Sequence, residues 1–204
     1  HGNRSVSSKS GAADVLEELG VKIDLSAERN KELLQEIDLC FLFAQAYHAS
    51  MRFAGPVRKE LGIRTVFNII GPLANPAFAS LQLLVVYGND GIDEVTVSST
   101  NTIAEINDGE ITTYTLDPQA FGFTPCKKSD LMGGDAKINA GITYDILSGK
   151  EQGAKRNAVV LNSGLSLYLG GKGSIKECIE LARITLDNGK ALQKLQQLIV
   201  LSNG

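Results

Sequence analysis

The sequence contains no run of basic residues, no signal-peptide pattern and no apolar stretch long enough to cross a bilayer. Its formal net charge is −3, and acidic and basic side chains are interspersed along the chain. Nucleic-acid-binding proteins usually carry a basic stripe, and a membrane-spanning helix needs about 20 consecutive apolar residues. These absences therefore predict a protein with neither a nucleic-acid partner nor a membrane partner.

Cysteine is scarce and widely spaced. Cys40, Cys126 and Cys178 form neither a closely spaced metal-binding pair nor a disulfide framework. Because disulfides are rare in reducing compartments, this spacing favours a reduced setting, and we expect a cytoplasmic location.

Several catalytic motifs are also absent. The sequence has no Walker loop, no Gly-x-Gly-x-x-Gly turn and no His-Glu-x-x-His pair, which excludes triphosphate hydrolysis, dinucleotide binding and zinc proteolysis. No Gly-x-Ser-x-Gly turn accompanies the serines of the N-terminal segment, so none of them is expected to be a nucleophile. His1 and His48 are possible acid–base groups, although a lone histidine is more often structural or exposed.

What the sequence does contain is an alternation of helical and strand patterns. With 204 residues, 43% of them apolar, the chain suits one large domain or one domain with a small appendage. We expect an α/β domain spanning residues 1–204. Apolar periodicity and capping residues predict helices over residues 12–19, 28–36, 47–61, 135–148, 154–169, 174–189 and 191–201. Ser26 should cap the second of these, with Leu33, Leu34 and Ile37 as its apolar stripe. Asp135 should cap the fourth, and Ser174 with Glu177 should form a capping box at the start of the sixth. Strands are expected over residues 39–44, 65–70 and 83–88, and a hairpin over 102–106 and 110–116, with its turn at 107–109.

Two of the expected strands, Leu39–Ala44 and Leu83–Gly88, are apolar throughout, which is typical of strands buried on both faces of a parallel sheet. Consecutive parallel strands need a crossover of roughly a dozen residues or more. Between Pro76 and Leu83, however, there is room only for residues 77–82. Either these strands are not sequential neighbours, or a segment of chain is missing near residues 79–83.

The opening segment, His1 to Gly11, has the composition of an anion-binding loop. Its glycines let the backbone approach a phosphate, its serines add donors, and Arg4 and Lys9 add positive charge. The segment leads into the N-terminus of an expected helix, where unpaired N–H groups and the helix dipole favour an anion. The alternative is a solvated loop in which Ser10 caps the helix.

Further candidate site residues lie later in the chain. Asp93 and Glu94 follow an expected buried strand, and adjacent carboxylates there are suited to Mg²⁺, which takes oxygen ligands and shares them with phosphates. The alternative is a pair of solvated loop acids. Arg58 could grip a planar carboxylate through two hydrogen bonds, whereas Arg52 is expected to be an ordinary surface charge.

These patterns follow one another in a recognisable order. They are His1-Gly2-Asn3-Arg4 with Ser7-Ser8, Gly11-Ala12-Ala13-Asp14, Val57-Arg58-Lys59-Glu60-Leu61-Gly62, Phe67-Asn68-Ile69-Ile70-Gly71-Pro72-Leu73 with Asn75-Pro76, and Gly91-Ile92-Asp93-Glu94. Together they resemble the anthranilate phosphoribosyltransferase family of tryptophan biosynthesis, from His1 through the C-terminal helices. The stretch from Phe67 to Pro76 is the most specific, and the Asp-Glu pair alone would be weak.

The resemblance implies a glycosyltransferase that moves the phosphoribosyl group of phosphoribosyl diphosphate (PRPP) to the amino group of anthranilate and releases diphosphate. It also implies dependence on Mg²⁺, a homodimer, and a large domain of the nucleoside phosphorylase type with a mainly parallel sheet flanked by helices. By position, PRPP would contact His1, Gly2, Asn3, Arg4, Ser5, Val6, Ser7, Ser8 and Ala12. Asn3 and Arg58 would bind anthranilate, and Asp93 and Glu94 would hold Mg²⁺ on the diphosphate. No residue is assigned as a general acid or base.

The sequence also departs from the family pattern. The family has a Gly-Thr-Gly-Gly-Asp loop, a metal-ligating serine and usually a lysine before the His-Gly-Asn segment, and none of these is present. It also has a strand and a helix where residues 79–83 stand here. We therefore expect that the sequence joins pieces of a longer protein, with the small helical N-terminal domain largely absent.

Two alternative functions stay open. One is a pyrimidine nucleoside phosphorylase-like enzyme, which shares this general fold. Its lysine- and serine-rich base-site signature is not found, and the stretch from Phe67 to Pro76 favours the transferase. The other is a catalytically inactive binding module on the same scaffold. A nucleic-acid-binding version of it is disfavoured by the net charge of −3.

Overall fold

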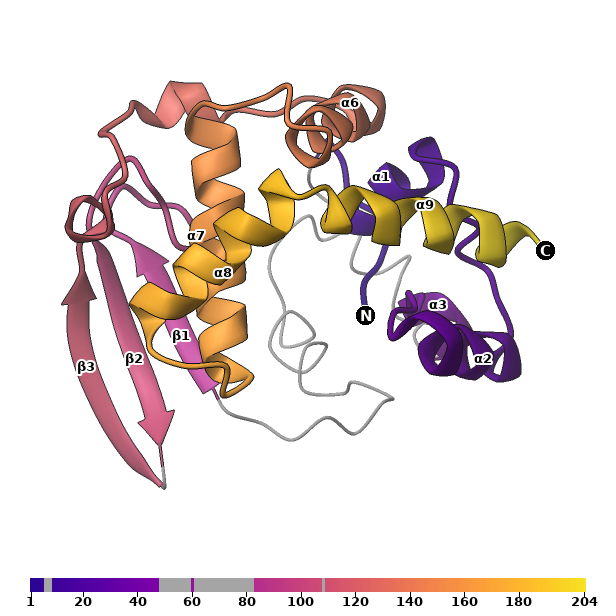
Figure 1. The fold of residues 1–204 in the computed structure, drawn as a ribbon, viewed down its shortest axis with the longest axis horizontal. Helices are drawn as coiled ribbons and strands as arrows, with labels where there is room; N and C mark the ends of the chain where they lie inside the picture. The colour runs from indigo at the N-terminus through magenta and orange to yellow at the C-terminus, as the bar shows by residue number, and fades with distance from the viewer. Residues whose placement is uncertain (6–8, 48–59, 61–82, 108) are drawn as a thin grey trace. The chain divides into compact units, whose positions relative to one another are not determined.

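The computed structural model describes residues 1–5, 9–47, 60, 83–107 and 109–204 (Figure 1). The chain divides into two compact units that interleave along the sequence. One unit comprises His1–Ala79, Gly133–Tyr144 and Leu192–Gly204, and the other comprises Ser80–Met132 and Asp145–Ala191. Each unit is described by itself.

The first unit is mainly helical in the residues described. Its elements are α1 (Ala12–Glu18), α2 (Ala27–Ile37), the short α3 (Ala44–Tyr47), the N-terminal part of α6 (Ala136–Leu147) and most of α9 (Lys190–Asn203). Ser26 caps α2 by accepting a hydrogen bond from the N–H of Arg29, as the sequence predicts. Leu33 and Ile37 bury one face of α2, whereas Leu34, expected in the same stripe, is 47% exposed.

Helix α9 joins the end of the chain to its beginning. The buried side chains of Leu195 and Leu198 give it an apolar face. Its hydrogen bonds to earlier residues run from Lys22 N–H to Ser202 Oγ (3.1 Å), from Arg29 Nη2 to the Leu201 carbonyl (2.7 Å) and from Lys194 Nζ to the Ile37 carbonyl (2.8 Å). The first unit is therefore complete only when the last residues are in place.

The prediction of a doubly buried strand over Leu39–Ala44 is wrong. The segment forms a single parallel bridge, between Gly2 and Phe43, and α3 begins directly afterwards. Phe43 is buried, whereas residues 39–42 are only half-buried. A strand needs a neighbour that pairs along its length, and among the described residues the N-terminal segment offers only Gly2.

The second unit contains a sheet whose described strands are β1 (Leu83–Gly88), β2 (Asn101–Asn107) and β3 (Glu110–Leu116), in that order. Strand β2 is antiparallel to both neighbours, and Ile103 lies opposite Val86 on one side and Tyr114 on the other. The predicted hairpin is confirmed. Gly109 adopts a φ of 83°, which suits a tight turn, while Asp108 lies outside the described residues.

Strand β1 is present at the predicted residues, but its expected burial on both faces is wrong. Val85 and Tyr87 are 56% and 54% exposed, and the described partner of β1 is antiparallel. Side chains alternate between the faces of a strand, so these two share the open face of the sheet. An antiparallel sheet tolerates one solvent-facing surface, and the apolar run reflects β propensity rather than two-sided burial.

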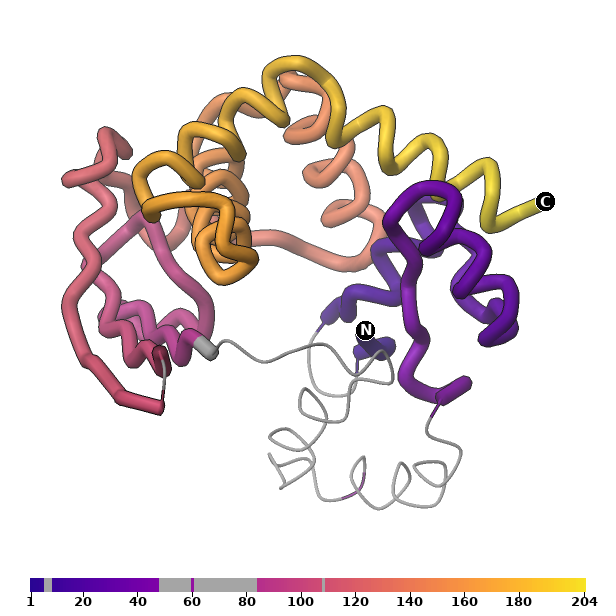
Figure 2. The backbone as a smooth tube through the Cα atoms, turned by 60° about the horizontal axis from the view of Figure 1, so that its bottom comes forward, coloured from indigo at the N-terminus to yellow at the C-terminus, as the bar shows by residue number. Residues whose placement is uncertain are grey.

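Helices α7 (Ala154–Leu169) and α8 (Ile175–Asp187) pack against each other beside this sheet (Figures 1 and 2). Gly164 permits their close approach, because a Cβ there would lie 2.6 Å from Cγ1 of Ile179. The predicted capping box of α8 is confirmed. The Ser174 hydroxyl accepts from the N–H of Glu177, and the Glu177 carboxylate accepts from the N–H of Ser174 at 2.8 Å.

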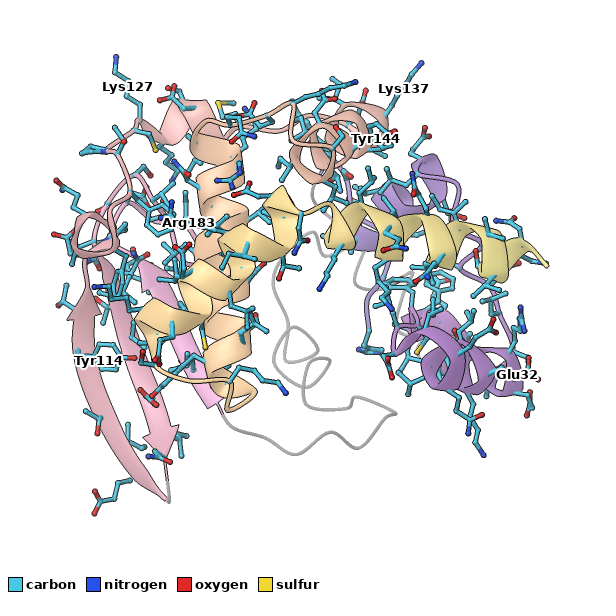
Figure 3. The ribbon with its side chains drawn as sticks, viewed as in Figure 1. Glu32, Tyr114, Lys127, Lys137, Tyr144 and Arg183 are labelled. Carbon is cyan, nitrogen blue, oxygen red and sulfur yellow. The ribbon has the colours of Figure 1, made fainter. Side chains whose placement is uncertain are left out.

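The loops of the second unit also pack onto its helices. The short 3₁₀ turns η1 (Pro118–Phe121) and η2 (Lys128–Leu131) follow the sheet. Arg183 of α8 donates to the Phe121 carbonyl (3.2 Å) and lies over the ring of Phe123, with its guanidinium carbon 4.6 Å from the ring centre (Figure 3). This side chain therefore fixes the segment that leaves η1.

Other predictions have mixed outcomes. The Asp135 carboxylate accepts from the N–H of Ile138 (2.9 Å) and starts α6 as predicted. The strand expected over residues 65–70 and most of the helix expected over residues 47–61 lie outside the described residues. Within the described ranges, no helix combines the length and the apolar character needed to cross a membrane.

Candidate functional site

The first residues of the chain are held by the segment between α2 and α3. The N–H of Gly2 donates to the Leu42 carbonyl (3.1 Å), and the Gly2 carbonyl accepts from the N–H of Ala44 (2.8 Å). A Cβ at Gly2 would meet the Phe41 ring at 3.1 Å and the methyl group of Ala12 at 3.6 Å. Two residues predicted to bind PRPP, Gly2 and Ala12, are thus brought together in one unit.

Asn3, a predicted substrate-binding residue, makes three hydrogen bonds among the described residues. Its Oδ1 accepts hydrogen bonds from the N–H of Arg4 (2.8 Å) and from Nε2 of Gln45 (3.2 Å), and its carbonyl accepts from the N–H of Ala13 (3.3 Å). The side chain is half-buried. These contacts fix its orientation between α1 and α3, as a group that positions a substrate requires.

Arg4 is held by two groups from separate parts of the first unit. Its Nη2 lies 2.7 Å from Oε1 of Glu17, and its guanidinium carbon lies 5.5 Å from the centre of the Phe43 ring. The ion pair is largely exposed, with the Arg4 side chain 47% accessible, so it contributes little stability. The contacts instead orient a guanidinium, which suits phosphate oxygens.

One carboxylate ties Ser5 to Gly11, the residue that precedes α1. Oδ2 of Asp14 accepts from the N–H of Ser5 (2.9 Å) and from the N–H of Gly11 (2.8 Å). These two bonds, the one from Ser5 first, hold the pKa of Asp14 below its ordinary value. Gly11 and not Ser10 is the N-cap of α1, so the alternative of a Ser10 cap is wrong.

The structure describes most of the predicted PRPP set. His1 and Arg4 are exposed, Gly2, Asn3 and Ser5 are half-buried, and Ala12 is exposed on the first turn of α1. Val6, Ser7 and Ser8 lie outside the described residues. The described residues 1–5 form a polar segment whose backbone is fixed at Gly2, Asn3 and Ser5 by hydrogen bonds.

The predicted metal pair belongs to the second unit. Asp93 and Glu94 follow β1 in the loop that begins at Gly88, and both are exposed. The loop is closed by hydrogen bonds from the N–H of Gly88 to the Ile92 carbonyl (2.9 Å) and from the N–H of Gly91 to the Gly88 carbonyl (2.8 Å). The two carboxylates therefore stand on a defined turn, open to solvent.

The carboxylate of Asp90 stabilises the loop that carries Asp93 and Glu94 through hydrogen bonds to residues on either side of them. This carboxylate accepts from the hydroxyls of Ser98 and Thr96 and from the N–H of Ile92 (3.3 Å). Burial by itself would raise the pKa of Asp90, but these hydrogen bonds outweigh it and the pKa is lowered. Nζ of Lys128 in turn donates to the Asp90 carbonyl (2.8 Å).

The donor set fits magnesium rather than a metal enclosed by protein. Within the described ranges, no cluster of three or more His, Cys, Asp or Glu side chains is placed to hold a metal. Mg²⁺ is usually bound through one or two carboxylates and completes its shell with water and substrate phosphates. The adjacent, exposed carboxylates of Asp93 and Glu94 match that mode.

Other predictions fall outside the described residues. Arg58, expected to bind anthranilate, is one of them, as are Arg52 and His48.

Sequence reasoning missed the residues that support the two loops. Asp14, Asp90 and Asn162 touch the backbone of the candidate segments. Asp14 stands three residues after its N-cap, which is the spacing of a capping box, so that bond was open to prediction. The contacts of Asn162 span 67 residues, and no local pattern indicates them.

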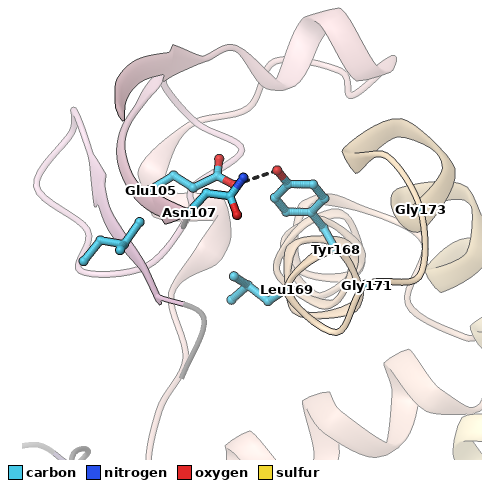
Figure 4. A pocket seen from close by; sticks show the side chains of 7 residues that line it. Glu105, Asn107, Tyr168, Leu169, Gly171 and Gly173 are labelled. Carbon is cyan, nitrogen blue, oxygen red and sulfur yellow. Dashed lines mark hydrogen bonds between the residues drawn. The ribbon is translucent and has the colours of Figure 1, made fainter. Parts of the chain in front are cut away.

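A separate pocket of about 250 Å³ lies between the end of β2 and the C-terminal end of α7 (Figure 4). Its main polar group, the Glu105 carboxylate, accepts from the hydroxyls of Tyr168 (2.6 Å) and Tyr114 (3.0 Å). Burial first and the bond to Glu105 second raise the pKa of Tyr114. The hydrogen bond from Tyr168 to Glu105 joins α7 to the sheet.

Comparison with known proteins places these features in context. The family model described as "Glycosyl transferase family, a/b domain" matches residues 1–90 and 82–192. The anthranilate phosphoribosyltransferase of Ruminiclostridium cellulolyticum is 48% identical over 228 residues, which cover 100% of this chain and 67% of that protein.

Solved structures agree. The anthranilate phosphoribosyltransferase of Thermus thermophilus superposes with a TM-score of 0.91 at 36% identity, covering 100% of this chain and 68% of the other. The enzyme from Saccharomyces cerevisiae in complex with PRPP and Mg superposes with a TM-score of 0.89 at 26% identity, covering 100% of this chain and 64% of the yeast chain. The yeast enzyme in complex with 4-fluoroanthranilate superposes with a TM-score of 0.85 at 25% identity, covering 95% of this chain and 63% of the yeast chain.

Proposed function

Because this chain belongs to the anthranilate phosphoribosyltransferase family of glycosyltransferases, which act in tryptophan biosynthesis, we propose that the residues described above carry that family's reaction. The function is transfer of the phosphoribosyl group of PRPP to the amino group of anthranilate, with release of diphosphate. The observation that carries this conclusion is the 48% identity to a relative of that name over the whole chain. It favours the transferase over a nucleoside phosphorylase or an inactive module.

The segment His1–Ser8, together with Ala12, binds PRPP in this proposal. Its support is the yeast relative solved with PRPP and Mg, and the fixed backbone and oriented guanidinium of Arg4 in this chain. Backbone N–H groups and a guanidinium are good donors to phosphate oxygens. A Cβ at Gly2 would lie 3.1 Å from the Phe41 ring, so a larger side chain there should disturb this part of the segment.

Asp93 and Glu94 hold Mg²⁺ in this proposal, as exposed carboxylates on a turn fixed by Asp90. When bound, Mg²⁺ offsets the negative charge that develops on the departing diphosphate. The protein's contribution is to present the two carboxylates in a fixed relation through the Gly88–Ile92 loop closure. No protein side chain is assigned as a general base.

Asn3 and Arg58 bind anthranilate in this proposal. The amide of Asn3 is fixed by Arg4 and Gln45, so it can orient a bound group without first being ordered itself. Arg58 is assigned by its position in the family motif. A guanidinium pairs with a planar carboxylate through two parallel hydrogen bonds, which sets the direction of the amine. Positioning supplies much of the rate in such a transfer.

Assembly, location and extent complete the proposal. We propose a homodimer and a cytoplasmic location, the latter supported by the free thiols of Cys40, Cys126 and Cys178. We also propose that residues 1–204 form the catalytic α/β part and that a segment is missing near residues 79–83. The family model matches in two stretches that overlap at residues 82–90, which supports this. An intact mass of 21.8 kDa for the natural protein would contradict it.

Anthranilate fluorescence tests the reaction. Its signal should fall when PRPP and Mg²⁺ are both added to the full-length protein, and should stay constant when either is omitted or Mg²⁺ is chelated. Inorganic phosphate with a pyrimidine nucleoside is the matched control for the phosphorylase alternative. Release of free base there, with no loss of anthranilate fluorescence, would overturn the transferase.

A further inference from the structure

The geometry points to Asp14 as a positioning residue for PRPP binding, which fixes the backbone at the end of His1–Ser5 in the conformation that receives the sugar diphosphate. This inference rests on the proposed assignment of PRPP binding to His1–Ser8. Oδ2 of Asp14 is engaged by two backbone N–H groups, those of Ser5 and Gly11. The carboxylate thus acts through the backbone of Ser5 and Gly11 and is not itself assigned to the substrate.

The two hydrogen bonds have different consequences. The bond from the N–H of Gly11 is an ordinary helix cap, because Gly11 is the N-cap and Asp14 stands three residues after it. The bond from the N–H of Ser5 spans nine residues and is not needed to cap a helix. It draws the end of the His1–Ser5 segment to the same oxygen.

Close packing at Gly11 also holds this residue against the backbone of Asn3 and Ser5. A Cβ at Gly11 would lie 2.5 Å from the nitrogen of Ser5 and 2.8 Å from the carbonyl oxygen of Asn3. The Asn3 carbonyl also accepts from the N–H of Ala13. The backbone of Gly11 therefore lies close to that of Asn3 and Ser5, and the Asp14 carboxylate accepts hydrogen bonds from Ser5 and Gly11 at that place.

The charge of Asp14 also requires explanation. A free carboxylate beside an anion-binding segment would repel a diphosphate. Here the two N–H donors and, more weakly, the positive charge of Arg4 stabilise the carboxylate and lower its pKa. The local cost of the negative charge is thus offset by the backbone groups that it orders, which is the arrangement expected of a loop-organising residue.

Kinetics of Asp14 variants in the full-length protein test the inference. Asp14→Ala should raise the KM for PRPP by about tenfold or more, the loss expected when hydrogen bonds to a charged group that order a binding loop are removed. The KM for anthranilate at saturating PRPP should stay unchanged. The KM for PRPP of Asp14→Asn should lie between those of the unaltered protein and Asp14→Ala, because an amide oxygen can accept the same hydrogen bonds without the charge.

Glu177→Ala is the matched control. The Glu177 carboxylate also accepts from a capping residue, at Ser174 N (2.8 Å) and Ser174 Oγ (2.7 Å), and its pKa is also lowered. This variant should lose helix capping without a change in either KM. If Asp14 were only a cap, Asp14→Ala would likewise lower the unfolding temperature and leave both KM values unchanged, and the inference would be wrong.

Further outcomes separate the inference from the proposed function. If Asp14→Ala does not fold, Asp14→Asn decides: a KM for PRPP raised about threefold or more supports the inference, and an unchanged KM overturns it. If the unaltered protein neither turns over anthranilate nor binds PRPP with Mg²⁺ in a calorimeter, the proposed function fails, and the role inferred for Asp14 fails with it.

Discussion

Asn162 of α7 hydrogen-bonds both backbone groups of Val95: its Oδ1 accepts from the Val95 N–H (3.2 Å) and its Nδ2 donates to the Val95 carbonyl (2.7 Å). Val95 is buried and directly follows Glu94. One helix side chain therefore fixes the chain immediately after the proposed Mg²⁺ ligands, while Asp90 fixes it just before them.

Asn162→Ala should therefore affect both stability and Mg²⁺ use. Two buried backbone groups lose their partner, which we expect to lower the free energy of unfolding by about 1–3 kcal/mol. The Mg²⁺ concentration for half-maximal rate should rise, because the loop carrying Asp93 and Glu94 loses one support. Urea unfolding and Mg²⁺ titration of the rate measure the two effects. Ser166→Ala, one turn further along α7, should leave the Mg²⁺ requirement unchanged.

Removal of the proposed ligands gives a sharper test. Asp93→Ala or Glu94→Ala should raise the KM for PRPP and the Mg²⁺ requirement by about tenfold or more, since Mg²⁺ has few protein ligands besides these carboxylates. The KM for anthranilate should change little. Glu110→Ala removes an exposed carboxylate of β3 and is the control. Equal effects in all three variants would contradict the metal assignment.

Arg58 should set the affinity for anthranilate. Arg58→Ala removes a bidentate, charge-assisted pair worth about 1.5–3 kcal/mol, so the KM for anthranilate should rise by one to two orders of magnitude. The KM for PRPP should stay near its original value. Steady-state kinetics measure both. Arg52→Ala, an arginine expected to be a surface charge, should match the unaltered protein; an equal rise there would remove the special role of Arg58.

A pair of helical glycines separates packing from helix propensity. Gly164→Ala places a methyl group against Ile179 and should cost about 1–3 kcal/mol of unfolding free energy. Gly141 of α6 is exposed, with nothing within 4 Å of an added Cβ. Gly141→Ala should instead stabilise the protein by about 0.5–1 kcal/mol. Chemical denaturation compares the two, and a stabilising Gly164→Ala would refute close packing of α7 on α8.

The tyrosines on Glu105 predict a loss of stability in alkali. The pKa values of Tyr114 and Tyr168 are raised in the folded protein. Their contribution to the free energy of unfolding is therefore complete below the unfolded-state pKa of about 10, and it is lost as the pH rises through their folded-state pKa values. The double variant Tyr114→Phe with Tyr168→Phe should show a weaker fall in stability above pH ~10. Tyr87→Phe, on the open face of the sheet, should retain the original fall.

Helix boundaries were largely readable from the sequence, because their signals are local. The Ser26 cap of α2, the Asp135 start of α6 and the Ser174 capping box each involve groups three residues apart. The hairpin joining β2 and β3 was equally accessible, since Gly109 marks a tight turn between two β-rich runs.

The burial and pairing of the strands could not be predicted in the same way. An apolar run does not reveal whether a second layer covers it, and so the open face at Val85 and Tyr87 was missed. At Leu39–Ala44 the local pattern favoured a strand, but only Gly2 pairs there among the described residues. The candidate site residues came from motifs of a family, whereas their supports, such as Asn162, depend on contacts across long stretches of chain.

The interleaving of the two units has a consequence for the gene. The chain passes from one unit to the other after Ala79, Met132, Tyr144 and Ala191, and α6 and α9 each straddle such a passage. A nonsense codon that removed only the final helix would take away the carbonyl of Leu201 and the hydroxyl of Ser202, on which Arg29 and Lys22 depend. Losing this helix would therefore weaken the packing of residues that stand 180 and 172 positions earlier in the chain.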